Sequence, residues 1–252
     1  MLGSTEKYLL EKIKTNGSIH ITLIDPEKVS VQQASHVAEN SQKSGTAAIM
    51  IGGSTVASQE HLDEVVKVIK RSVKIPTILF PGNVTGISMY ADAIWFMSLL
   101  NSVDPYFLIG AQVRGAPLIK KYGIEPISMG YIIVGDGGTA GVVGKAVTVP
   151  YTKPELAAAH ALAGQYLGMR FIYLEGGSGA AHPVPPEMIR AVKKLIDIPL
   201  IVGGGIRSKE LAVAAASAGA DIIVTGNVTE SSDANQRISE IIGAITGIKV
   251  LP

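Results

Sequence analysis

The chain has 252 residues, a formal net charge of +1 at pH 7 and no cysteine. This length is typical of one (β/α)8 domain. The near-neutral charge gives no case for binding nucleic acid or an anionic membrane surface, and the lack of cysteine excludes disulfides, thiolate nucleophiles and cysteine-based zinc sites. No apolar run approaches the ~18 residues that a membrane span needs. Because the N-terminus does not resemble a signal peptide either, we expect a cytoplasmic protein without stable membrane insertion.

In chain order, a short amphipathic helix over residues 1–17 precedes a regular alternation of strands and helices. The predicted strands are Ile19–Ile24, Ala47–Ile51, Thr77–Phe80, Ala93–Leu99, Ile127–Val134, Phe171–Leu174, Leu200–Val202 and Ile222–Val224. The predicted helices are Val31–Lys43, Glu60–Ser72, Pro105–Lys121, Pro154–Leu167, Pro186–Leu195, Ser208–Ser217 and Asp233–Ile245. Alternation implies a parallel sheet, and eight strands imply closure into a (β/α)8 TIM barrel. With no linker rich in proline or serine, we expect a single domain over residues 1–252.

One connection is too short for the pattern. Only about a dozen residues separate the third and fourth predicted strands, from Pro81 to Asp92, and they include Gly82 and Gly86. A crossover helix with its turns usually needs at least that many residues. We therefore expect the third helix to be missing or degenerate, which would leave a gap in the outer wall beside the barrel mouth and a route for a long substrate.

A glycine-rich segment, Gly135–Gly144, partly imitates a dinucleotide-binding fingerprint. The residues after it, KAVTVPYTKP, do not read as a helix, so the segment lacks the strand–glycine–helix context that such a fingerprint needs. We predict a loop over the barrel mouth, and the sequence does not decide whether it acts as a lid.

The last two predicted strands run directly into glycines, at Gly203, Gly204 and Gly205 and then at Gly226. A helical segment follows each of them. Unpaired N–H groups at a helix start lie at the positive end of the helix dipole and bind phosphate without a basic side chain. Two such units at the end of a (β/α)8 chain form the usual phosphate cradle after strands 7 and 8. Ordinary tight turns are the alternative interpretation.

Polar residues at the ends of the first two predicted strands suggest a metal site, because catalytic groups in barrel enzymes lie at the carboxyl ends of strands. Asp25 ends the first strand and Ser54 follows the second. Carboxylate and hydroxyl oxygens suit Mg2+, which keeps several waters and bridges protein oxygens to substrate phosphates. Capping of a turn or helix is the alternative role for both residues.

Glu175 is the best candidate for a general base, since it leaves an apolar strand and enters the loop Gly176-Gly177-Ser178-Gly179. Tyr173 points to the same side of the strand and could orient the same substrate hydroxyl. A salt bridge inside the barrel is the alternative role for Glu175. The five histidines show no metal-ligand spacing; we expect surface positions for His36, His61 and His160 and a turn role for His182. Lys28 and Arg207 could add charge near a phosphate or be solvated.

Taken together, the motifs resemble the geranylgeranylglyceryl phosphate synthase family over essentially the whole chain. They are LIDPEK at 23–28, IGGS at 51–54, FPGN at 80–83, YLEGGSG at 173–179, VGGGIRS at 202–208 and TGN at 225–227. The resemblance implies a barrel with a non-helical third connection. It also implies a Mg2+-dependent prenyltransferase that joins sn-glycerol 1-phosphate to geranylgeranyl diphosphate through an ether bond and releases diphosphate, the first committed step of archaeal membrane phospholipid synthesis.

The resemblance also assigns residues. It places Mg2+ at Asp25 and Ser54, and it makes Glu175 the expected base, beside Tyr173. The glycerol phosphate would be bound by Tyr173, Leu174, Glu175, Gly176, Gly177, Ser178, Gly179, Gly204, Gly205, Gly226 and Asn227.

Alternatives remain open at this point. A heptaprenylglyceryl phosphate synthase would use the same head-group residues with a deeper groove. A sugar-phosphate isomerase, an FMN-dependent oxidoreductase or a non-catalytic phosphate-binding barrel would share the terminal cradle. Apolar residues in Pro105–Lys121 predict a homo-oligomer, a dimer or larger.

Overall fold

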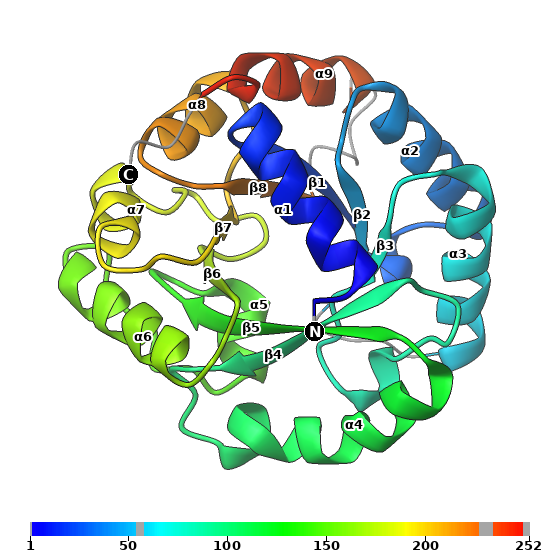
Figure 1. Cartoon of the computed structure of the whole chain (residues 1–252), viewed down its shortest axis with the longest axis horizontal. Coiled ribbons are helices and arrows are strands. Elements are labelled where there is room, and N and C mark those ends of the chain that lie inside the picture. Colours follow the sequence, from blue (N-terminus) through cyan, green and yellow to red (C-terminus); the bar gives the residue numbers. More distant parts are fainter. Residues whose placement is uncertain (1, 54–57, 227–233, 249–252) are drawn as a thin grey trace.

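In the computed structural model, eight parallel strands close into a barrel in simple chain order, from β1 to β8 and back to β1. The structure describes residues 2–53, 58–226 and 234–248. Helices surround the barrel, as Figure 1 shows in a view along its axis. The predicted (β/α)8 architecture is therefore confirmed.

The strands match their predicted positions to within two residues. Their bounds are β1 Ile19–Ile24, β2 Ala48–Ile51, β3 Thr77–Leu79, β4 Ala93–Leu99, β5 Glu125–Ile133, β6 Phe171–Glu175, β7 Leu200–Gly203 and β8 Ile222–Thr225. Most of their residues are buried, as expected for a parallel sheet covered on both faces. β6 and β7 run further than predicted, so Glu175 and Gly203 are themselves strand residues.

The main helices also lie where the apolar periodicity placed them. Their bounds are α1 Ser4–Asn16, α2 Val31–Lys43, α3 Gln59–Ser72, α4 Ala111–Tyr122, α6 Pro154–Tyr166, α7 Pro186–Lys193, α8 Lys209–Ser217 and α9 Ala234–Ile245. Within the described ranges, no helix is both long and apolar enough to cross a lipid bilayer. A π-helical stretch, η3 (Tyr106–Gly110), leads into α4.

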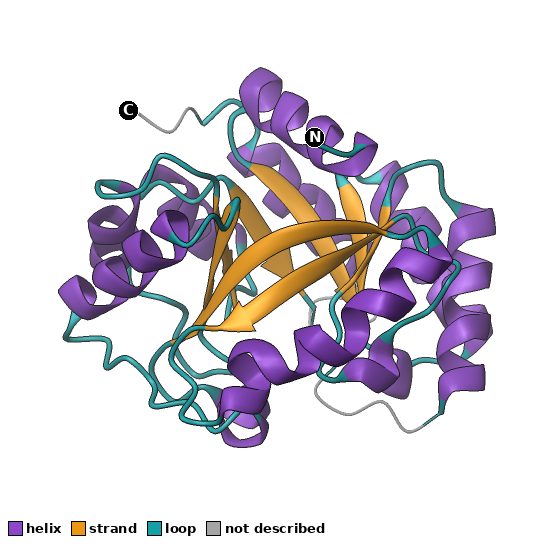
Figure 2. Cartoon of the chain, turned by 60° about the horizontal axis from the view of Figure 1, so that its bottom comes forward, coloured by secondary structure: helices purple, strands orange, loops and turns teal. Residues whose placement is uncertain are grey.

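Helix α1 covers the amino-terminal end of the barrel, across one opening in Figure 2. Its Leu9 is fully buried in the same apolar cluster as the inward-facing strand residues. The Glu125 carboxylate, at the start of β5, accepts the Thr5 and Glu6 amides at 2.8 and 2.9 Å. These amides lie in the first turn of a helix and have no partner within it. With this end closed, ligands reach the barrel at the other end, where the strands finish.

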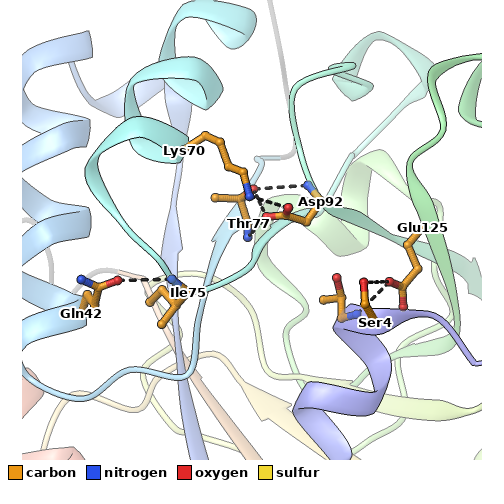
Figure 3. Close-up of polar contacts among 8 residues, drawn as sticks. Ser4, Gln42, Lys70, Ile75, Thr77, Asp92 and Glu125 are labelled. Carbon is orange, nitrogen blue, oxygen red and sulfur yellow. Dashed lines mark hydrogen bonds and ion pairs between the residues drawn. The ribbon is translucent and has the colours of Figure 1, made fainter.

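The third crossover contains no α-helix. Between β3 and β4 the chain forms only one short 3-10 turn, η2 (Val84–Gly86). Asp92, directly before β4, ties the end of this connection to the start of β3. The Asp92 carboxylate accepts hydrogen bonds from the amide and the hydroxyl of Thr77, each at 2.9 Å, and forms an ion pair with Lys70 (Figure 3). These contacts hold the pKa of Asp92 below its ordinary value, despite the opposing effect of its partial burial. The predicted loss of the third helix is confirmed.

The segment Gly135–Gly144 is not the plain loop that we predicted. It contains a six-residue helix, α5 (Gly138–Val143), preceded by Gly137 in a left-handed conformation (φ +68°). The amide of Gly144 closes the last turn on the carbonyl of Ala140 at 2.9 Å. Sequence reasoning missed this helix because glycine in a helix interior is unfavourable by propensity alone.

His20 is almost fully buried on β1, although the sequence attached no role to it. Its ring nitrogens lie 2.9 Å from the hydroxyls of Thr46 and Thr225. Burial lowers the pKa of His20 to about 3, so the ring stays neutral near neutral pH. It links β1, the approach to β2 and the end of β8 behind the barrel wall.

Candidate functional site

A groove opens at the carboxyl end of the strands and continues past β3 and β4 toward α4. Asp25, directly after β1, and Glu175, the last residue of β6, both line it, so the two carboxylates lie at the same end of the barrel. The apolar part of the lining includes Phe80, Val84, Ile87, Ile94, Trp95, Phe96, Phe107, Tyr131 and Ile119. The groove thus follows the side of the barrel where the third helix is absent.

Glu175 lies where the polar and apolar parts of the groove meet. It is the last residue of β6 and only 7% exposed. Its Oε1 accepts the amide of Gly177 at 2.6 Å, and the hydroxyls of Tyr131 and Tyr173 donate hydrogen bonds to its carboxylate. A buried carboxylate is costly unless donors surround it; here a loop amide and two phenols do so.

Burial raises the pKa of Glu175 above its ordinary value, and the hydrogen bonds from Gly177, Tyr173 and Tyr131 oppose that rise. The same burial, with the nearby Glu175 charge, raises the pKa of both tyrosines well above the usual value. The tyrosines therefore keep their protons and act as donors. A carboxyl group with a raised pKa is suited to proton transfer near neutral pH.

Tyr131 is a site residue that the sequence analysis missed. It lies near the carboxyl end of β5, outside the motifs that the sequence analysis singled out, and it pairs in register with Tyr173 on β6. Phe80 stacks on Tyr173 with ring centroids 5.5 Å apart and meets Tyr131 edge-on at the same distance. The three rings form one aromatic cluster, and two of them, Tyr131 and Tyr173, bond to Glu175. Only the pairing of strands brings Tyr131 to this position. The sequence alone could predict that Tyr131 faces the same side of its strand as Ile133, but not that it lies beside Tyr173.

The glycine-rich loops after β6 and β7 pack directly against each other. The amide of Gly176 donates to the carbonyl of Gly203 at 3.0 Å. Gly204 has φ +86°, and a Cβ there would lie 2.6 Å from both the Gly177 amide nitrogen and Glu175 Oε1. Only glycine fits this close approach.

The remaining predicted phosphate residues do not all lie in the groove. Ser178 and Gly226 line the groove. Gly179 is exposed on the loop after β6. Gly205 packs against the same loop, since a Cβ at Gly205 would lie 3.0 Å from the nitrogen of Pro183. Leu174 differs, because its side chain packs in the outer cluster between the sheet and the helices, and it does not line the groove. Asn227 lies outside the described residues.

Asp25 lines the groove and also has the capping role that we gave as its alternative. Its Oδ1 accepts the amide of Glu27 at 3.1 Å, at the start of the 3-10 turn η1 (Pro26–Lys28). The backbone of Gly53, at the end of β2, packs against the same carboxylate, since a Cβ there would lie 2.6 Å from Oδ1. Lys28 lines the groove nearby. Ser54 lies outside the described residues. Across the described ranges, no cluster of three histidine, aspartate or glutamate side chains is arranged to hold a metal.

Other polar residues serve the loops. His61 is half-buried rather than on the surface as predicted, and its Nε2 donates to the carbonyl of Pro26 at 2.8 Å. His36 is exposed, as expected. The guanidinium of Arg207 donates to the carbonyl of Ala180, so it joins the loops after β6 and β7. The carbonyl of His182 accepts the hydroxyl of Tyr151 at 3.0 Å.

Comparison with known proteins identifies close relatives. The model of the PcrB family matches residues 10–245. A geranylgeranylglyceryl phosphate synthase of Thermofilum pendens is 53% identical over 97% of this chain and 94% of its own length. The enzyme of the same name from Thermococcus gammatolerans is 54% identical over 99% of both chains.

A solved structure is similar throughout. The crystal structure of (S)-3-O-geranylgeranylglyceryl phosphate synthase from Thermoplasma acidophilum, in complex with sn-glycerol-1-phosphate, superposes with a TM-score of 0.93 at 42% identity. It covers 97% of this chain and 99% of the Thermoplasma chain. The match therefore extends over the whole barrel.

Replacing Tyr131 by Phe removes one hydroxyl donor from the Glu175 carboxylate and leaves the ring in place. Because that hydrogen bond stabilises the charged form, we expect the pKa of Glu175 in Tyr131→Phe to rise further above the ordinary glutamate value. A 13C NMR titration of the Glu175 carboxyl, assigned by its loss in Glu175→Gln, measures the change. Tyr90→Phe, on the surface, serves as the control. An unchanged or lower pKa in Tyr131→Phe would contradict this description of the site.

Proposed function

The chain belongs to the PcrB family, and we propose that it joins sn-glycerol 1-phosphate to geranylgeranyl diphosphate through an ether bond, releasing diphosphate. The observation that carries this proposal is the position of Glu175. A buried carboxylate with a raised pKa lies between glycine-rich loops on one side and an apolar groove on the other. A proton acceptor at that junction suits a reaction between a small polar phosphate and a long apolar chain.

The glycine-rich loops supply the polar half of the proposed site. The amides of Ser178 and Gly179, with Gly204, Gly205 and Gly226 beside them, come from the ends of β6, β7 and β8, while the amide of Gly177 holds Glu175. Main-chain N–H groups bind a phosphate in barrels of this class without a cationic side chain. The Thermoplasma relative was crystallised with sn-glycerol-1-phosphate, which supports this choice of ligand.

The apolar groove supplies the other half. Aromatic rings lie near Glu175, and aliphatic side chains such as Ile87, Ile94 and Ile119 lie further along toward α4. Removing each CH2 group from water contributes ~0.8 kcal/mol, so a twenty-carbon chain gains on the order of 10 kcal/mol before the cost of ordering it. The missing third helix leaves the length of wall that such a chain requires.

We also propose Mg2+ as the cofactor, with Asp25 as its protein ligand. A single carboxylate that lines the groove fits Mg2+, which usually takes one or two carboxylates, several waters and substrate phosphate oxygens. When bound, the ion neutralises the charge that develops on the leaving diphosphate. Ser54 is the second ligand that the sequence predicts. The side chain of Lys28, at the same rim, adds positive charge toward the diphosphate.

The chemical step then needs few groups from the chain. Loop amides hold the glycerol phosphate so that its free primary hydroxyl faces the first carbon of the prenyl chain. The bond between that carbon and the diphosphate oxygen breaks, and the hydroxyl oxygen forms the ether bond. Glu175 takes the hydroxyl proton, while Tyr131 and Tyr173 hold the carboxylate in place. Buried surroundings keep water from competing for the allylic carbon.

Product formation from radiolabelled sn-glycerol 1-phosphate and geranylgeranyl diphosphate tests the function. We expect Glu175→Gln to lose at least ~100-fold in kcat, the usual contribution of a general base, and still to bind sn-glycerol 1-phosphate. Because the base must be ionised, wild-type activity should fall as pH drops through the raised pKa of Glu175. A panel of shorter and longer prenyl diphosphates identifies the chain length; no product with any of them would refute the proposal.

The same assay tests the metal. Activity should disappear on chelation, return with added Mg2+, and need a higher Mg2+ concentration in Asp25→Asn than in the wild type. Asp63→Asn, on the outer helix α3, is the matched control. Full activity in the presence of a chelator would rule out the cofactor.

Gly204→Ala tests the phosphate loops. Its methyl group would lie 2.6 Å from Glu175 Oε1, so the loops must move apart, and we expect affinity for sn-glycerol 1-phosphate to fall about ten- to a hundredfold. Gly168→Ala is the control, because Gly168 has nearly the same backbone (φ +87°) with nothing within 4 Å of an added Cβ. Calorimetric titration measures both. Equal losses would attribute the effect to backbone strain alone.

We further propose a homo-oligomer. On the segment Pro105–Lys121, Ile109 and Val113 are 60% and 66% exposed, one helical turn apart. Burying such side chains against a second copy of the chain removes apolar surface from water. Sedimentation velocity checks this: the wild type should sediment as a dimer or larger and Val113→Asp as a smaller species, whereas a monomeric wild type would contradict it.

A further inference from the structure

Two side chains from outside the loop hold the far half of the β6–α7 loop (residues 176–185), which carries the proposed glycerol phosphate contacts. Arg207 donates to the carbonyl of Ala180, and Tyr151 donates to the carbonyl of His182 at 3.0 Å. Within the loop, the amide of Ala180 bonds to the carbonyl of Gly177 at 3.1 Å. A glycine-rich loop with so few internal bonds depends on external anchors for one defined shape.

The barrel wall fixes the backbone that leads to Tyr151. Val149 forms a parallel bridge with Val134, just beyond the end of β5. The amide of Gly135 donates to the carbonyl of Val149 at 2.9 Å, and the amide of Val149 donates to the carbonyl of Ile133 at 3.1 Å. Two residues after this bridge, Tyr151 therefore starts from an extension of the sheet, which is more rigid than a free loop.

The ring of Tyr151 packs between the segment that follows β5 and the β6–α7 loop. A Cβ at Gly135 would lie 2.2 Å from Tyr151 Cζ, and a Cβ at Gly176 would lie 3.6 Å from the Tyr151 hydroxyl oxygen. The phenol ring thus packs against the backbone of Gly135, after β5, and its hydroxyl lies beside Gly176, the first residue of the β6–α7 loop. The hydroxyl donates its hydrogen bond to the carbonyl of His182, in the second half of the same loop. One side chain thus contacts the loop at its first residue and again in its second half.

The surroundings keep Tyr151 as a donor. Burial first, and then the negative charges of Asp136 and Glu175, raise the pKa of Tyr151 above its ordinary value. The hydroxyl therefore stays protonated and donates a hydrogen bond to the carbonyl of His182. Tyr151 is not among the residues that line the groove, so it acts on the loop rather than on the prenyl chain.

We propose that Tyr151 is a positioning residue for the glycerol phosphate, a role that rests on the proposed function. Its hydroxyl holds the β6–α7 loop in the shape in which the amides of Ser178 and Gly179 face the substrate, while the Gly177 amide stays bonded to Glu175. The apolar groove does not depend on this contact. Loss of the hydroxyl therefore changes the use of one substrate and leaves the other unaffected.

Steady-state kinetics of Tyr151→Phe test the proposal, because this variant keeps the ring against Gly135 and removes only the hydrogen bond. We expect KM for sn-glycerol 1-phosphate to rise about three- to tenfold, the range of one lost hydrogen bond, with KM for geranylgeranyl diphosphate within about twofold of the wild type. Tyr151→Ala, which also loses the ring, should show a larger rise. Tyr166→Phe, on an exposed tyrosine of α6, is the matched control.

Thermal unfolding of each variant separates positioning from general damage. The positioning role would be overturned if Tyr151→Phe left the KM for sn-glycerol 1-phosphate unchanged or raised both KM values equally. Product formation by the wild type would still support the proposed function in that case. A wild-type chain that makes no product would instead overturn the proposed function, and this inference with it.

Discussion

The site depends on one constraint, the burial of a carboxylate at the end of β6. Glu175 is held by a loop amide 2.6 Å away and by two phenols from neighbouring strands. Without these donors, a charged group in this position would cost several kcal/mol. With them it becomes a group that can accept a proton near neutral pH. The same contacts connect the barrel interior to the β6–α7 loop, so the proton acceptor and the phosphate loop are positioned together.

The missing third helix is the second constraint, and it shapes the apolar half of the site. A barrel normally covers each strand with a crossover helix. Here a short turn replaces one, and Asp92 closes it by binding the start of β3. Phe80, just after β3, and Ile94 and Phe96 of β4 then line a groove with α4 instead of packing beneath a crossover helix. Loss of one standard element thus provides the wall that a long chain needs, without opening the barrel itself.

Several features could be predicted from the sequence because they depend on neighbours along the chain. Apolar runs of three to eight residues marked the strands, and the dozen residues from Pro81 to Asp92 were too few for a crossover helix with its turns. Glycines after β7 and the run after Glu175 marked the polar loops. Helix α5 was missed, since its glycines and valines have low helix propensity and its position depends on contacts with other loops. The role of His61 was missed for a similar reason, because its partner, Pro26, lies 35 residues away.

By itself, then, the sequence determined the barrel class, the absent helix, the carboxylates Asp25 and Glu175 and the glycine-rich loops, all of which follow from local periodicity, local length or recognisable motifs. Only the tertiary structure placed Tyr131 beside Tyr173 and Tyr151 against the β6–α7 loop. Both positions come from strand register: β5 pairs with β6, and Val149 pairs with the end of β5. Register brings together residues 42 positions apart in the first case, and no pattern along a single segment carries that information.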